Sequence, residues 1–215
     1  LPVLTEKGMA PDWASACEVV SFVKAHDGIF CVSQNYRYNG GERTVLRVLT
    51  DPTDPAYLGR PFLLDCTHHR VRPHPRTLTY PFASVWDMSC HHFDNLLCWF
   101  GPVEEMTAHS FAAPWSPYEH DNNTSALIRF KSGVVVTYLH SHDASRGEFR
   151  LALHGERGAL VGRVLDWSSS TSGLERLTFT RRPEEQFGAE TEVDIPFSTH
   201  KGEAGVLEDF YAYAV

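Results

Sequence analysis

The chain has 215 residues, of which 42% are hydrophobic and 21% charged, a composition typical of a globular protein with a substantial core. Its net charge of -8 argues against a nucleic-acid or anionic-membrane partner, and no segment is long and apolar enough to span a bilayer. The five cysteines are scattered without a CxxC pair and no signal peptide is visible, so we expect reduced thiols and a cytoplasmic location.

The first part of the chain has the pattern of one strand–helix–strand unit. Residues 2–4 are strand-like, residues 11–26 place apolar side chains on one helical stripe, and residues 28–33 resemble a buried strand. This order is typical of a parallel α/β sheet. One such unit has too few strands to form a stable layer, so we expect it to belong to something larger.

From residue 35 onwards the pattern changes to α+β. A helix at 41–49, a strand at 61–71 and a helix at 87–100 precede a run of strands, predicted at 103–111, 124–130, 134–141, 148–155, 159–164, 176–181 and 191–197. Short turns such as FKSGVV link them, which predicts an antiparallel meander. A loop at 168–173 and a helix at 203–215 complete the prediction. The expected fold class is a large, mostly antiparallel open sheet with helices on one face.

Reactive side chains gather in the segment VWDMSCHHFDNLLCWFG, residues 85–101. Its apolar residues follow helical spacing and predict a core face made of Phe93, Leu96, Leu97 and Phe100. Asp87 and His91 are four residues apart on the opposite side, and a carboxylate beside an imidazole can orient a general base. A solvated Asp–His pair is the alternative. His92 lies off this stripe, near Trp99, where it could pack or line the rim of a substrate site.

Two metal-site interpretations are weaker. Asp87, His91 and Asp94 could bind a divalent cation, but metal sites usually draw ligands from several elements. His68 and His69 alternate faces of a strand, so at most one could join any site. We therefore predict no metal ligand in this chain.

Lys7 is a second candidate, because it follows a strand at the edge where parallel sheets bind ligands. A surface lysine in a turn is the alternative. The cluster NYRY, residues 35–38, follows the next strand, so its polar groups could emerge at the same edge.

These clusters, in this order, resemble the glucose–fructose oxidoreductase, inositol dehydrogenase and MocA-like (Gfo/Idh/MocA) family. The family motif V-x-x-E-K-P-x-A corresponds to VLTEKGMA, G-x-N-x-R-F to SQNYRY, and D-x-G-x-H-x-x-D to DMSCHHFD. Two later family motifs are also present. A-x-x-x-F-x-x-G corresponds to ALIRFKSG within SALIRFKSGVV, and G-x-x-G-x-L corresponds to GERGAL. The resemblance covers nearly the whole chain.

The resemblance implies an NAD(P)-dependent oxidoreductase that transfers a hydride between a nicotinamide cofactor and a hydroxyl carbon of a sugar, polyol or related compound. It implies that Asp87 orients His91, that His91 takes the hydroxyl proton, and that Lys7 is the third catalytic residue. The residues implied at the NAD or NADP cofactor are Glu6, Lys7 and Arg37, and those implied at the substrate are Asn35, Tyr36, Trp86 and His92.

Two residues depart from the family pattern. Gly8 stands where the family has proline, which leaves Lys7 less preorganised, and Ser89 replaces a glycine. The lysine, aspartate and histidine are intact, which favours an active dehydrogenase. A non-catalytic nucleotide- or sugar-binding regulator of the same family is the alternative.

The resemblance also divides the chain into two parts. Residues 1–34 are expected to be the tail of a Rossmann-like NAD(P)-binding domain whose bulk lies outside this chain. Residues 35–215 are expected to form a substrate-binding and dimerisation domain that is incomplete at its C-terminus. The open face of its sheet would pair with a second copy, giving a homodimer or homotetramer.

Overall fold

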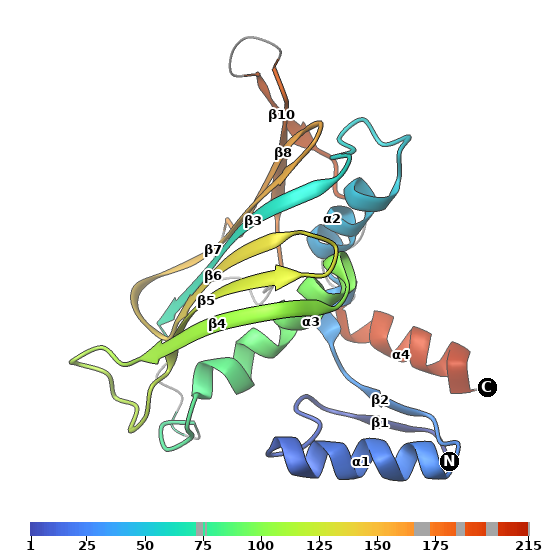
Figure 1. Cartoon of the computed structure of the whole chain (residues 1–215), viewed down its shortest axis with the longest axis vertical. Helices are drawn as coiled ribbons and strands as arrows, with labels where there is room; N and C mark the ends of the chain where they lie inside the picture. The colour runs from blue at the N-terminus through green and yellow to red at the C-terminus, as the bar shows by residue number, and fades with distance from the viewer. Residues whose placement is uncertain (72–74, 76, 166–172, 184–187, 197–201, 215) are drawn as a thin grey trace.

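In the computed structural model of the chain, the structure describes residues 1–71, 75, 77–165, 173–183, 188–196 and 202–214. Figure 1 shows a small two-stranded sheet beside a large eight-stranded one. The small sheet pairs β1 (Val3–Thr5) in parallel with β2 (Phe30–Val32), and α1 (Trp13–Ala25) connects them. The predicted strand–helix–strand unit is therefore present.

The helix α1 begins where a side chain satisfies its free backbone amides. Asp12 caps it and accepts a hydrogen bond of 2.8 Å from the Ser15 amide. No residue of α1 is fully buried, and Trp13 and Phe22 remain 82% and 64% exposed. The unit thus has an apolar helix surface that the rest of the described chain does not cover.

The large sheet has the strand order β10-β9-β8-β7-β3-β6-β5-β4. Its strands are β3 (Pro61–Val71), β4 (Val103–Phe111), β5 (Asn123–Phe130), β6 (Val135–Ser141), β7 (Asp143–Gly155), β8 (Gly158–Arg163), β9 (Arg176–Arg181) and β10 (Glu190–Val193). Neighbouring strands are antiparallel except β3 and β6, which are parallel. The predicted fold class is confirmed.

The order of strands differs from the predicted meander at one place. The strand β3 inserts between β6 and β7, pairing with both, so these two consecutive strands are not neighbours. Leu64 and Cys66 of β3 are buried, as befits a central strand. Local turn patterns report which strands follow one another, but not which distant strand enters between them, so the meander was wrong here.

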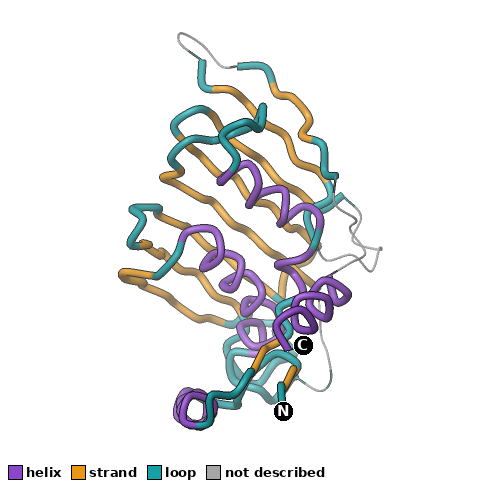
Figure 2. The backbone as a smooth tube through the Cα atoms, turned by 90° about the vertical axis from the view of Figure 1, so that its right-hand side faces the viewer, coloured by secondary structure: helices purple, strands orange, loops and turns teal. Residues whose placement is uncertain are grey.

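Helices cover one face of this sheet (Figure 2). They are α2 (Gly40–Thr50) and α3 (Cys90–Phe100), and a π-helical turn at Val85–Ser89 leads into α3. The helix α4 (Gly202–Ala214) packs instead against a 3₁₀ turn at Asn35–Tyr38. Within the described residues, no helix is both long and apolar enough to cross a membrane. The predicted loop at 168–173 lies outside the described residues except for Gly173.

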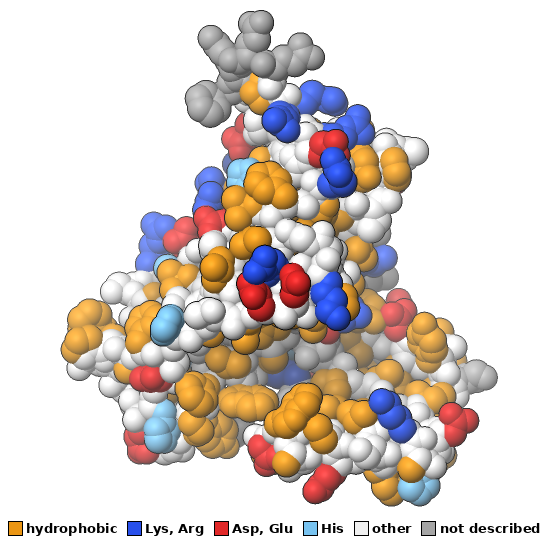
Figure 3. All heavy atoms as spheres, in the orientation of Figure 1, with side chains coloured by type: hydrophobic (Ala, Val, Ile, Leu, Met, Phe, Trp, Pro, Cys, Tyr) orange, Lys and Arg blue, Asp and Glu red, His pale blue; other side chains and the backbone are white. Residues whose placement is uncertain are grey.

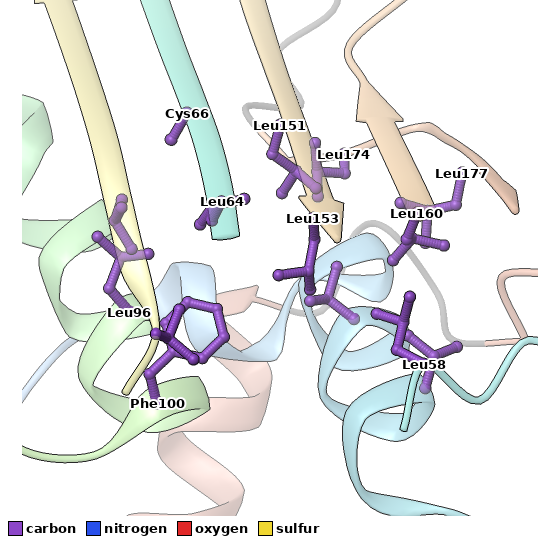
Figure 4. Close-up of a cluster of buried hydrophobic side chains, with 14 of the residues drawn as sticks. Leu58, Leu64, Cys66, Leu96, Phe100, Leu151, Leu153, Leu160, Leu174 and Leu177 are labelled. Atoms are coloured by element: carbon purple, nitrogen blue, oxygen red, sulfur yellow. The ribbon is translucent and has the colours of Figure 1, made fainter. Parts of the chain in front are cut away.

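The core lies between the sheet and the helices α2 and α3 (Figure 4). Leu96 and Phe100 of α3 pack there with Leu64 and Leu153 of the sheet, as their helical spacing predicts. Leu97 is 47% exposed, so the predicted stripe is narrower on that side. The buried stripe turns instead towards His92 and Asn95, which are 3% exposed each.

Candidate active site

Lys7 lies directly after β1 and reaches the turn that precedes α3. Its Nζ lies 3.2 Å from Asp87 Oδ1 and donates a second hydrogen bond to the Asp87 backbone carbonyl. The two side chains are 23% and 19% exposed, so the ion pair is partly shielded yet reachable from solvent. The Lys7–Gly8 peptide bond is cis. The Lys7–Asp87 ion pair thus joins the segment after β1 to the π-helical turn before α3.

His91 occupies the first turn of α3 and is 5% exposed. Its ring stacks on Tyr36, with ring centroids 4.5 Å apart and planes 8° apart. Its Nδ1 lies 2.8 Å from Gln34 Oε1. An amide oxygen only accepts hydrogen bonds, so Nδ1 carries the proton and Nε2 keeps its lone pair. The ring is therefore fixed as the tautomer that can accept a proton at Nε2.

The charge state of His91 follows from its surroundings. Burial lowers its pKa most, the Lys7 ammonium lowers it further, and the Asp87 carboxylate offsets part of the decrease, giving a pKa of about 4. At neutral pH the imidazole is uncharged. A neutral imidazole beside an ammonium ion is a base next to a group that stabilises negative charge.

A cavity of about 590 Å³ opens beside this group. Four parts of the chain line it: the segment after β1, β2 with the turn that follows it, the π-helical turn with the start of α3, and α4. The lining residues are Gly8, Met9, Cys31, Val32, Gln34, Arg37, Tyr38, Trp86, Cys90, Asp94, Val206, Asp209, Phe210 and Tyr213. Figure 3 shows the surface hollowed between the sheet body and the layer of α1. The volume is within the range of small-molecule sites.

Ion pairs and hydrogen bonds fix the 3₁₀ turn at one wall of the cavity. Arg37 binds Asp94 of α3 through two hydrogen bonds, Nε to Oδ2 at 2.8 Å and a terminal nitrogen to Oδ1 at 2.6 Å. Asn35 donates to Glu203 of α4 at 2.9 Å. Bidentate guanidinium–carboxylate pairing sets orientation as well as charge. The turn that carries Tyr36 is thereby held between α3 and α4.

The structure brings some of the predicted site residues together. Lys7 pairs with Asp87, and Tyr36 stacks on His91. The charges of the first pair act on the His91 ring, and Arg37 and Trp86 line the adjoining cavity. Glu6 is exposed directly after β1. The Asn35 side chain contacts α4 instead.

Two contacts differ from the sequence-based picture. The Asp87 carboxylate binds Lys7, while His91 Nδ1 donates its hydrogen bond to Gln34 Oε1, which belongs to a residue that the sequence alone did not single out. Its position just before NYRY, at the end of a strand, was the available signal. His92 points away from this group and bonds Tyr138 in the interior, with Nδ1 and the phenol oxygen 2.8 Å apart.

The metal-site alternative on α3 finds no support in these contacts. Asp87 is paired with Lys7, and Asp94 is paired with Arg37. In the part of the chain that the structure describes, the one cluster with metal-ligand spacing is a group of buried histidines elsewhere: His68, His92 and His140.

The fold and the group around His91 define an α+β domain with a ligand-sized site beside a parallel β–α–β unit. The family model for the GFO/IDH/MocA C-terminal domain matches residues 54–161, half of the chain. The chain belongs to this family. No curated protein sequence matches it.

Three solved structures show the same fold. A proposed NADPH-dependent oxidoreductase from Desulfitobacterium hafniense has a TM-score of 0.83 at 17% identity, covering 99% of this chain and 62% of its own. UDP-N-acetylglucosamine 3-dehydrogenase from Acidithiobacillus ferrooxidans has a TM-score of 0.76 at 17% sequence identity, and the match covers 100% of this chain and 62% of that one. An Agrobacterium radiobacter oxidoreductase in complex with NAD⁺, L-tartaric acid and magnesium has a TM-score of 0.73 at 18% sequence identity, and the match covers 99% of this chain and 60% of that one. The chain therefore spans less than two thirds of their length.

Proposed function

We propose that this chain is part of an NAD(P)-dependent oxidoreductase that transfers a hydride to or from a hydroxyl-bearing carbon of a sugar, polyol or related compound. The observation that carries the proposal is the Lys7–Asp87 ion pair beside a neutral His91 whose tautomer Gln34 fixes. Family membership and the similar oxidoreductase structures support it.

The residues at the cavity fit a nicotinamide and a small alcohol. Gly8 and Trp86 lie side by side in the cavity lining, where a Cβ added to Gly8 would make an ordinary contact of 3.7 Å with the indole ring. Arg37 lines the cavity, and Lys7 and the exposed Glu6 directly precede the lining residue Gly8, so we propose that these three residues hold the cofactor. A nicotinamide held by these residues would supply the acceptor for the hydride of the alcohol carbon.

The protein residues supply the proton chemistry. As the C–H bond breaks, the substrate hydroxyl loses its proton to His91 Nε2, and the alcohol becomes a carbonyl. The Lys7 ammonium donates a hydrogen bond to the oxygen while negative charge develops on it. Asp87 holds that ammonium in place, and Tyr36 keeps the imidazole plane fixed. The reverse reaction uses the same groups.

We also propose that the β1–α1–β2 unit is part of the cofactor-binding layer and that the protein is cytoplasmic. The exposed apolar side chains of α1, Trp13 and Phe22, suit a surface that another layer covers. All five cysteines are free thiols, as expected in a reducing compartment.

The uncovered face of the large sheet supports a homo-oligomer. The strand β4 is exposed along its whole length, and Met106 and Leu127 are 57% and 54% exposed on this region of the sheet. Burial alternates along β5, so its outward side chains form a face opposite the helices. We propose that a second copy of the chain covers this face.

The decisive assay offers the full-length protein NAD⁺ and NADP⁺ with a panel of sugars, nucleotide sugars, polyols and hydroxy acids. His91→Ala should reduce turnover of the best substrate at least 100-fold. His120→Ala, at an exposed histidine between β4 and β5, should leave it unchanged. Equal turnover in wild type and His91→Ala would refute the assignment. Nucleotide binding with no turnover of any alcohol would support the regulator instead.

A further inference from the structure

Three buried histidines converge between the large sheet and α3. His68 lies on β3, His92 on α3 and His140 on β6, with exposed fractions of 1%, 3% and 0%. One ring nitrogen of each lies within 4.8 Å of the other two. His68 and His140 are direct partners in the parallel register of β3 and β6. The sheet thus positions His68 and His140 next to each other, and α3 contributes His92.

Hydroxyl groups hold two of the three rings through Nδ1. His92 Nδ1 lies 2.8 Å from the Tyr138 hydroxyl, and His140 Nδ1 lies 2.7 Å from Ser89 Oγ. The Tyr138 hydroxyl donates its own proton to Ser89 Oγ at 2.8 Å. It therefore accepts from His92, which leaves the proton of that ring on Nδ1 and a lone pair on Nε2.

The second ring nitrogens of His92 and His140, their Nε2 atoms, are buried. Among the described residues, neither His92 Nε2 nor His140 Nε2 has a hydrogen-bond partner. A buried nitrogen left this way is unfavourable in an apolar interior. Metal-binding histidines in proteins commonly show this arrangement, with one nitrogen tied to an outer partner and the other free for the ion.

The three imidazoles are better suited to binding a metal ion than to binding a proton. Burial lowers the pKa of all three histidines most, and neighbouring histidines and the Arg70 guanidinium lower it further, so the rings are neutral at pH 7. Neutral imidazole is the ligand form, and three imidazoles without a carboxylate suit Zn²⁺, Co²⁺, Ni²⁺ or Cu²⁺ better than Mg²⁺ or Ca²⁺.

We propose that His68, His92 and His140 form a binding site for a divalent transition-metal ion, of the zinc class, that ties α3 to β3 and β6. Tetrahedral coordination at about 2.0–2.1 Å needs ligand nitrogens about 3.3–3.4 Å apart, so the rings must close by no more than about 1.5 Å. The inference stands apart from the proposed oxidoreductase activity, since it concerns a different group of side chains.

The test uses the full-length protein, stripped with a chelator and then titrated with Co²⁺ and Zn²⁺. We expect one metal ion per chain, cobalt absorption bands of a tetrahedral nitrogen site, and a rise in melting temperature with Zn²⁺. His140→Gln and His68→Gln should each weaken binding at least 100-fold. His120→Gln, at an exposed position between β4 and β5, should bind as the wild type does.

A milder variant guards against loss of folding. Tyr138→Phe keeps the packing but removes the hydroxyl that orients His92, and it should weaken Zn²⁺ binding about 10–100-fold. X-ray absorption of the cobalt-loaded wild type should show three imidazole nitrogens. Binding that is equal in the wild type and in His140→Gln, no binding by the wild type, or a cobalt shell without imidazole would each overturn the proposal.

Discussion

Replacing Gln34 with glutamate should raise the pKa of His91 and thereby the pH at which the enzyme loses activity. Gln34 Oε1 lies 2.8 Å from His91 Nδ1 as a neutral acceptor. A carboxylate in that place favours the charged imidazolium. The folded protein now holds His91 neutral, with a pKa of about 4, through burial and the Lys7 charge.

The size of the effect follows from the geometry. Two unit charges about 4 Å apart attract by about 4 kcal/mol at an effective dielectric constant of about 20, which corresponds to about 3 pKa units. The adjoining cavity admits solvent and reduces this. We expect the pKa of His91 to rise by about 1–3 units, so the base is protonated over a wider range of acid pH.

Two measurements check the shift. NMR titration of the His91 Cε1 proton, assigned by its absence in His91→Ala, reports the pKa directly. The pH profile of kcat/KM should move its acidic limb upward by the same amount. Gln34→Met, which is similar in size and uncharged, should show no upward shift. An unchanged His91 titration in Gln34→Glu would show that Gln34 does not contact this ring.

Three further predictions concern stability and assembly. Burial raises the pKa of Glu42 to about 8, so its neutral carboxyl stabilises the fold below about pH 4.5, and that contribution is lost as the pH rises through 8. Glu42→Gln should therefore raise the free energy of unfolding at pH 8 by about 2 kcal/mol, measured by urea denaturation. Glu18→Gln, at an exposed position, is the neutral control. The buried histidines His68, His92 and His140 should give the opposite pH dependence of stability. Because their pKa values in the folded protein lie below 6.5, the free energy of unfolding should fall as the pH drops from 6.5. A free energy of unfolding that does not change with pH in this range, measured by denaturant titration, would contradict their burial. Leu127→Glu on the open sheet face should convert the assembly to monomers in light scattering, whereas Val20→Glu on α1 should not; an unchanged mass for Leu127→Glu would argue against pairing through this face.

Local features of the sequence predicted most elements because they have local causes. The Asp12 cap and the apolar stripe of α1 both lie within the helix they define. The alternation of β5 likewise reflects the two faces of one strand. The insertion of β3 between β6 and β7 depends on pairing between distant segments, which no local pattern records.

The candidate site divides in the same way. Lys7 and His91 could be found because each belongs to a short motif with its own spacing. The hydrogen bond from His91 to Gln34 joins residues 57 positions apart, so helix spacing pointed to Asp87 instead. His92 looked like a polar residue at a rim, but its partner Tyr138 lies 46 positions away on a buried strand.

In the proposed mechanism, Lys7 stabilises developing negative charge on the substrate oxygen while His91 removes the proton. Stopped-flow measurement of the hydride-transfer rate in Lys7→Met tests it most directly, with exposed Lys24→Met as the control. We expect a decrease of about 100–1,000-fold for Lys7→Met, comparable to removing one oxyanion donor, and no change for the control. A hydride-transfer rate within twofold of wild type in Lys7→Met would contradict the mechanism.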